Sequence, residues 1–251
     1  MATHFFATTH NQTISLAAQP APFTFDRATS AVLVVDMQND FGAEGGMLDR
    51  LGIDISMIQN AVDPIANVLR VARETGIKVV YLKMGFCPDL ADLGAVDSPN
   101  RVRHLFAGVG ESMRAPDGTQ SRVLIRDTWN TAILPQLAPQ SDDVVIYKHR
   151  YSGFYETALD ATLKRMGINT LIVTGCTTSV CVESTVRDAM FRDYHCLLLA
   201  DCMGEPIGDG LSRSNHDASL LVVQLQFGWV AESMALINAL HEQPATVAQA
   251  L

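Results

Sequence analysis

The sequence has 251 residues, a net charge of −9 at neutral pH and 48% hydrophobic residues. This acidic balance argues against non-specific binding to nucleic acids or to anionic membrane surfaces, because both need a basic face. No apolar run reaches the ~18 residues needed to cross a bilayer, so we expect no membrane partner.

The N-terminal residues 1–24 contain no Lys or Arg and no continuous apolar core, so they do not form a secretory signal. We interpret them as a mobile arm that is free to wrap a neighbouring subunit. We expect residues 25–243 to form one domain and residues 244–251 a C-terminal tail. The five cysteines show no repeated spacing, so we expect reduced thiols in the cytoplasm rather than a disulfide framework.

Short Val, Ile and Leu runs alternate with amphipathic stretches along the domain. The runs predict buried strands at residues 30–37, 77–83, 143–148, 168–176 and 195–202. The stretches between them predict helices at residues 56–76, 131–138, 156–167, 179–193, 213–228 and 233–240. Nearly continuous apolar strands separated by helices predict an α/β fold, with a parallel β-sheet covered by helices on both faces.

Residues 84–128 interrupt this alternation with a long segment rich in Gly, Asp, Pro and Arg. Segments of this length without regular structure are often functional, so we favour a lid or an oligomer contact. Its arginines are candidates to hold a substrate carboxylate, although surface or subunit contacts are the more ordinary role; they are Arg101, Arg103, Arg114, Arg122 and Arg126.

Ligands of open parallel sheets bind at the carboxyl ends of the strands. Asp36, Lys148 and Cys176 lie at three such ends, and Cys181 follows near the first turn of the next helix. A helix start lowers the pKa of a thiol, so we interpret Cys181 as the nucleophile and Cys176 as a small buried side chain. Each residue taken alone also has a non-catalytic interpretation. Cys181 could be a structural cysteine, Asp36 a helix cap or a metal ligand, and Lys148 a surface lysine.

Other chemistries have little support in the sequence. The seven histidines are scattered, and the five-residue spacing of the two cysteines matches no common zinc signature. A phosphate-binding loop, a GxGxxG fingerprint and a GxSxG motif are all absent from the sequence. We therefore expect neither a metal nor an organic cofactor.

Three stretches together resemble the isochorismatase-like cysteine hydrolase superfamily: AVLVVDMQNDF (31–41), IYKHRYSGF (146–154) and VTGCTTSVCVESTVRDA (173–189). The resemblance implies a Rossmann-like parallel sheet, assembly into homodimers or homotetramers, and a catalytic triad of Asp36, Lys148 and Cys181. It further implies a cis peptide at Cys176–Thr177 and an oxyanion hole formed by the backbone N–H groups of Thr177 and Cys181. No His lies near residues 77–90, so the metal site of related nicotinamidases is not expected.

Within this superfamily, residues 150–154 and 227–230 look like ureidoacrylate amidohydrolases, whereas residues 88–93 look more like biuret hydrolases. The resemblance implies cleavage of a C–N bond in a small ureide or linear amide through a Cys thioester, with release of ammonia or carbamate. Biuret or N-carbamoyl amide hydrolysis is the alternative, and Met84-Gly85-Phe86 departs from the ureidoacrylate pattern. Vinyl-ether hydrolysis, which dispenses with the nucleophilic Cys, and a non-catalytic binding protein are the remaining hypotheses. Side chains expected in the substrate pocket are Phe41, Phe86, Tyr151 and Gln226.

Overall fold

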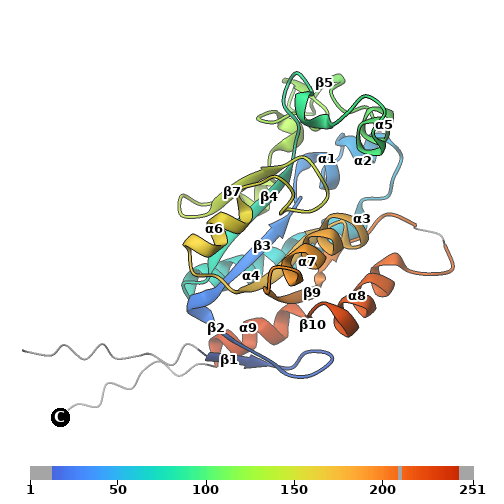
Figure 1. Cartoon of the computed structure of the whole chain (residues 1–251). Coiled ribbons are helices and arrows are strands. Elements are labelled where there is room, and N and C mark those ends of the chain that lie inside the picture. Colours follow the sequence, from blue (N-terminus) through green and yellow to red (C-terminus); the bar gives the residue numbers. More distant parts are fainter. Residues whose placement is uncertain (1–12, 209–210, 243–251) are drawn as a thin grey trace, which may run out of the picture.

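The computed structural model describes residues 13–208 and 211–242 (Figure 1). A six-stranded parallel sheet, in the order β10–β9–β8–β3–β4–β7, forms the centre of the molecule. Its strands are β3 (Ser30–Val35), β4 (Lys78–Met84), β7 (Val144–Lys148), β8 (Thr170–Cys176), β9 (His195–Gly204) and β10 (Trp229–Ala231). The predicted parallel α/β fold is confirmed. Of the six strands of this sheet only β10 was not predicted, because its apolar run of three residues is shorter than the roughly four to eight typical of a strand.

Helices cover both faces of the sheet (Figure 1). One face packs against α3 (Ser56–Asn60), α4 (Val62–Glu74) and α9 (Ser233–His241), and the other against α6 (Leu159–Arg165), α7 (Glu183–Met190) and α8 (Asn215–Gln226). Successive side chains of β3 alternate between the two cores: Val32 and Val34 enter the first, and Leu33 and Val35 the second. Burial on both faces explains why the strands read as continuous apolar runs.

Three predicted helices differ in detail from the observed ones. The helix predicted at 56–76 is divided into α3 and α4, and the one at 179–193 begins with a π-helical turn, η5 (Thr178–Val182), before α7. The helix predicted at 131–138 is replaced by the 3₁₀ turns η3 (Trp129–Thr131) and η4 (Pro135–Leu137), since Pro135 cannot donate the backbone hydrogen bond of a helix interior. Among the described residues, none of the helices is long and apolar enough to span a bilayer.

The first described residues form a hairpin of β1 (Thr13–Leu16) and β2 (Phe23–Asp26). Ile14, Leu16, Phe23 and Phe25 are buried and belong to the core shared with α9. The expectation of a mobile arm is therefore wrong for residues 13–24, because alternating apolar side chains fix this hairpin to the domain. Residues 1–12 and the expected tail 244–251 lie outside the described residues.

The segment 84–128 folds over the carboxyl ends of the strands, beside α1 (Asn39–Gly42) and α2 (Met47–Arg50) (Figure 1). Its elements are η2 (Ala91–Leu93), α5 (Pro99–Phe106), β5 (Ser112–Arg114) and β6 (Gln120–Arg122). The buried carboxylate of Asp40 ties it to the rest of the domain. Asp40 Oδ2 accepts the Leu124 N–H at 2.7 Å, and its Oδ1 accepts the Met47 N–H at 3.0 Å.

Candidate active site

The order of the strands places a crevice between β3 and β8. The chain leaves β3 toward β4 on one side and later returns to β8 on the other, so the connections diverge between these two strands. Such a switch point, at the carboxyl ends of the strands, is where open α/β sheets bind ligands. Asp36 directly follows β3, and Cys181 lies five residues after the end of β8, in η5.

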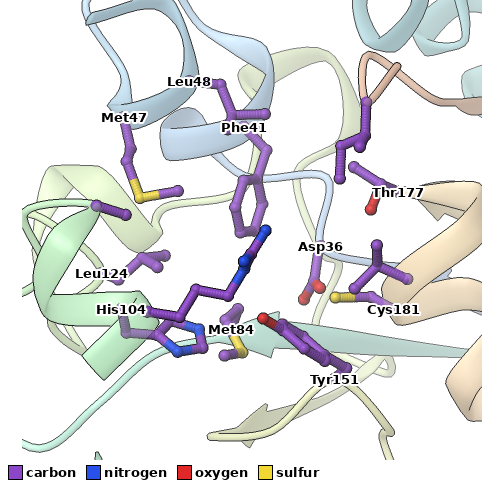
Figure 2. A pocket seen from close by; sticks show the side chains of 14 residues that line it. Asp36, Phe41, Met47, Leu48, Met84, His104, Leu124, Tyr151, Thr177 and Cys181 are labelled. Atoms are coloured by element: carbon purple, nitrogen blue, oxygen red, sulfur yellow. The ribbon is translucent and has the colours of Figure 1, made fainter. Parts of the chain in front are cut away.

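Lys148 brings the charged part of the site together. Its Nζ lies 2.7 Å from Asp36 Oδ2 and 3.3 Å from Cys181 Sγ. Lys148 ends β7, and β4 separates this strand from β3, so the long side chain must pass Met84, whose Sδ is 3.5 Å from Nζ. Figure 2 shows the Asp36 carboxylate beside the Cys181 sulfur. Asp36 and Lys148 are fully buried, and Cys181 is 6% exposed.

Burial dominates the proton affinities of this cluster. It raises the pKa of Asp36, with the charge of Lys148 opposing the rise. It also raises the pKa of the Cys181 thiol, again with Lys148 opposing. Burial lowers the pKa of Lys148, but its interactions with the Asp36 carboxylate and the Cys181 sulfur outweigh this effect and leave the pKa above its ordinary value. The prediction of an acidified Cys181 thiol is therefore wrong, because loss of solvent outweighs the favourable position at a helix start.

The backbone around the cluster adopts uncommon conformations at Asp36, Gly175 and the Cys176–Thr177 peptide. Asp36 has φ 53°, a left-handed conformation that is uncommon outside glycine. Gly175 has φ 115°, and a Cβ there would meet the Val35 carbonyl oxygen at 2.0 Å, so only glycine allows β8 to approach β3 this closely. The Cys176–Thr177 peptide is cis, as the resemblance predicts. Cys176 is fully buried, and its Sγ donates to the Asp36 carbonyl oxygen at 3.3 Å, which agrees with a packing role.

The cluster opens into a cavity of about 390 Å³, within the size range of small-molecule sites. Of the side chains predicted to contact substrate, Phe41 and Tyr151 line this cavity, as does Thr177 (Figure 2). Most of the other lining residues are apolar, namely Met47, Leu48, Met84, Ala107, Leu124, Val180 and Ile207. The remaining lining residues are Asp36, Cys181, Arg103 and His104.

Two predicted substrate contacts are not made, and both assignments are wrong. Phe86 is fully buried and does not line the cavity; its ring packs edge-on against His104, 5.1 Å away. Gln226 lies beside His195 at the amino ends of the strands, in a different depression. The physical reason is that α8 runs back along the sheet, so its last residue returns to the end opposite Cys181.

Three further residues shape the site. The sequence does not distinguish them from their neighbours, although Gln38 lies in the stretch 31–41 and Arg103 is among the candidate arginines. Gln38 is buried and clamps the end of β4, since its amide donates to the Met84 carbonyl oxygen at 2.9 Å and accepts the Met84 N–H at 2.8 Å. Arg103 is one of five similar arginines in its segment, and His104 carries no motif. The Ser98-Pro99 pair is a signal that places both on a helix, because Ser98 Oγ caps α5.

Possible metal ligands are dispersed. Within residues 13–208 and 211–242, no three His, Cys, Asp or Glu side chains are grouped so that they could hold a metal ion. Asp36 is instead paired with Lys148, and His104 is the histidine that faces the cavity.

Comparisons with known proteins agree on one family. A model of the isochorismatase domain matches residues 30–235. The ureidoacrylate amidohydrolase RutB of Methylorubrum extorquens is 38% identical over 92% of this chain and 91% of its own length, and RutB of Yersinia enterocolitica is 36% identical over 90% and 95%. A cysteine hydrolase structure from Pseudomonas syringae superposes with a TM-score of 0.73 at 29% identity, covering 88% of this chain and 96% of that one. The N-carbamoylsarcosine amidase structure from Thermoplasma acidophilum gives 0.60 at 25% identity, covering 82% and 96%.

Proposed function

Since this chain belongs to the isochorismatase-domain family, we propose that it is a cysteine-dependent amidohydrolase that cleaves a C–N bond of a small ureide related to ureidoacrylate. The observation that carries the proposal is the position of Lys148 Nζ, 2.7 Å from Asp36 Oδ2 and 3.3 Å from Cys181 Sγ, behind a cavity that Asp36 and Cys181 line. The similarity to RutB and to the N-carbamoylsarcosine amidase supports a ureide substrate.

The first half of the reaction forms a thioester-like bond. At rest the thiol is neutral, because burial raises the pKa of Cys181. As Sγ attacks the substrate carbonyl carbon, Asp36 takes the thiol proton, and the raised pKa of the buried Asp36 makes it a better acceptor for that proton. Lys148 remains cationic and stabilises the negative charge as it moves from Asp36 to the sulfur.

The second half releases both products. The backbone N–H groups of Thr177 and Cys181 hold the oxyanion, a contribution typically worth roughly 3–4 kcal/mol of barrier per donor. Asp36 returns its proton to the leaving nitrogen, so the C–N bond breaks and ammonia departs from a terminal ureide. Water then attacks the S-carbamoyl group with Asp36 as the base, which regenerates the thiol and yields a carbamate.

We also propose that the protein is a cytoplasmic homo-oligomer. All five cysteines are unpaired, and a thiol nucleophile must stay reduced, which favours the cytoplasm. Large apolar side chains on two helices are exposed: Leu221 and Leu225 on α8, and Val102 and Phe106 on α5. A second copy of the chain would bury such faces, and light scattering would give the mass of the assembly.

A screen for ammonia release tests the proposed function. The substrates are 3-ureidoacrylate, biuret, N-carbamoyl amino acids, maleamate and nicotinamide, assayed with the parent protein, Cys181→Ala and Cys176→Ala. We expect the parent to hydrolyse a ureide, and Cys181→Ala to lose at least about 10⁴-fold in kcat/KM, as other enzymes do without their nucleophile.

Cys176→Ala is the matched control, because it removes a thiol that is five residues away and fully buried. It should retain most of the activity. Activity in Cys181→Ala together with an inactive, folded Cys176→Ala would reverse the assignment of the two thiols. Absence of ammonia release from every substrate would instead favour a non-catalytic protein.

A further inference from the structure

The wall of the cavity formed by α5 carries two polar side chains that the proposed triad does not use. Arg103 and His104 are consecutive, and both line the cavity. Most of the remaining lining is apolar. In a largely apolar pocket, the few polar groups determine which functional groups a ligand must carry.

The orientation of the His104 ring leaves one nitrogen for a ligand. Nδ1 lies 2.7 Å from the Asn100 carbonyl oxygen, which only accepts hydrogen bonds, so Nδ1 carries a proton. The ring is 7% exposed and is held between the rings of Phe86 and Tyr151, with centroids 5.1 and 5.8 Å away. In the described part of the chain, Nε2 makes no hydrogen bond.

The protonation state of His104 makes this nitrogen an acceptor. Burial lowers the pKa of His104, and the nearby positive charges of Lys148, Arg150 and Arg103 lower it further, against the opposing hydrogen bond to Asn100. A neutral ring protonated at Nδ1 has a bare lone pair at Nε2. A ureide or primary amide carries the N–H groups that such an acceptor binds.

Arg103 differs from the other arginines of this segment. Those four are engaged locally: Arg126 pairs with Asp92 at 2.7 Å, while Arg101, Arg114 and Arg122 donate to main-chain carbonyl oxygens. Arg103 makes neither an ion pair nor a hydrogen bond through its side chain to the residues that the structure describes. Among the lining residues the acid is Asp36, which is already paired with Lys148. The Arg103 guanidinium thus faces the cavity without a counter-charge.

We propose that Arg103 and His104 form the subsite that selects the substrate, in which Arg103 binds a carboxylate and His104 Nε2 accepts an N–H of the ureide or amide. The inference rests on the proposed function for the reaction that follows, but binding can be measured without turnover. According to this inference the substrate is an anionic ureide or amide, such as a ureido acid. Uncharged ureides such as biuret should bind with lower affinity. Guanidinium–carboxylate bonds are among the stronger hydrogen bonds in proteins, because both partners are charged.

The test measures binding by calorimetry in a Cys181→Ala background, which removes turnover. The probes are 3-ureidoacrylate and its uncharged carboxamide. Into this background we introduce Arg103→Gln, His104→Asn and the control Arg70→Gln. Arg70 is an exposed arginine on α4 that pairs with Glu74, so its replacement changes the net charge equally but leaves the cavity intact. Asn at 104 keeps a donor near the position of Nδ1 and removes Nε2, and thermal melting verifies that each variant is folded.

Two distinct losses are expected. Arg103→Gln should weaken binding of the carboxylate by roughly 10- to 100-fold and leave the carboxamide within about twofold, since hydrogen bonds to charged groups are the stronger class. His104→Asn should weaken both probes to the same extent, by about 3- to 10-fold. Arg70→Gln should change neither.

Several outcomes would overturn the subsite: equal affinity for the two probes in the starting protein, an unchanged carboxylate affinity in Arg103→Gln, or no saturable binding of either probe. A loss in Arg103→Gln that is equal for both probes would also overturn it, as a general disturbance of the wall. Ammonia release by the intact protein is scored separately. Binding that depends on Arg103 without ammonia release would therefore end the proposed function and leave the subsite in place.

Discussion

Two regions border the cavity: the rim of the sheet, formed by the carboxyl ends of the strands and the residues that follow them, and the segment 84–128. They differ in how firmly their side chains are fixed and in how their charges are paired. The rim contributes Asp36, Lys148 and Cys181, whose main chain is set by parallel pairing and by two buried cores. The segment 84–128 contributes Arg103, His104 and Leu124 from a short helix and a loop. The charges at the rim are paired and buried, whereas Arg103 is exposed and without a counter-charge among the described residues.

This difference assigns the catalytic reaction to the rim and substrate recognition to the segment 84–128. A proton transfer between fixed groups needs distances held by the most stable part of the domain. Recognition of a particular substrate needs only side chains that present the right charge, and loops on a rigid scaffold provide them. Changes at the rim should therefore abolish the reaction, and changes in the segment 84–128 should alter substrate binding.

Replacement of Lys148 is expected to give the largest effect. Lys148→Met keeps a long apolar side chain but leaves Asp36 as an unpaired buried charge. We expect kcat/KM to fall at least about 10²-fold, as for loss of a group that assists proton transfer. The free energy of unfolding should fall by roughly 3–5 kcal/mol, measured by urea denaturation at neutral pH.

The double variant Asp36→Asn/Lys148→Met provides the control for this prediction. It removes both charges, and Asn tolerates the left-handed backbone at position 36. We expect it to recover most of the lost stability but no activity. A Lys148→Met protein as stable as the parent would show that the ion pair does not hold the rim together.

Asp40 joins the two regions, and its replacement should have an intermediate effect. Its carboxylate accepts N–H groups from Met47 and Leu124, which both line the cavity. In Asp40→Asn, the amide NH₂ would face one of these two N–H donors and could not accept from it. We expect KM to rise about 3- to 10-fold, with kcat nearly unchanged, from the loss of one such hydrogen bond. Steady-state kinetics with the preferred ureide would measure both constants.

The pH dependence of stability gives Asp40 a second test. Burial raises the pKa of Asp40 from 3.8 to about 6, although hydrogen bonds from Asn130, Leu124 and Met47 oppose the rise. The folded state thus holds a proton that the unfolded state has lost, so this contribution to stability is present below the unfolded pKa and is lost as the pH rises through about 6. The difference in unfolding free energy, parent minus Asp40→Asn, should fall by roughly 3 kcal/mol in total as the pH rises, and roughly 2 kcal/mol of this fall should occur between about pH 4 and pH 6. A difference that does not vary with pH would contradict this account.

The smallest effect is expected outside both regions. Gln226 lies beside His195, at the end of the sheet opposite Cys181. Gln226→Ala should change kcat/KM by no more than about twofold, since substitutions away from a site usually alter free energies by less than about 0.5 kcal/mol. A rise in KM without a change in kcat would instead indicate that Gln226 contacts the substrate, and the site would then have to be located elsewhere.

The strand ends that carry the site follow from the sequence, because apolar runs mark where each strand stops. The runs predict Asp36, Lys148 and the cysteine pair at those ends, and the folded chain brings Asp36, Lys148 and Cys181 together. The predictions for Phe86 and Gln226 are wrong because their positions depend on how the chain turns after β4 and in which direction α8 runs. Neither property is encoded in the local pattern of side chains.

The sequence by itself determined the class of fold, the family and the residues at the carboxyl ends of the strands, because periodicity and motif spacing are local properties of the chain. Only the tertiary structure decided the proton affinity of Cys181, the packing of the N-terminal hairpin and the placement of Arg103 and His104. These depend on desolvation and on contacts between residues far apart along the chain. Burial reversed the expected shift in the pKa of the thiol, since the loss of water around a charge outweighs the field of a nearby helix end.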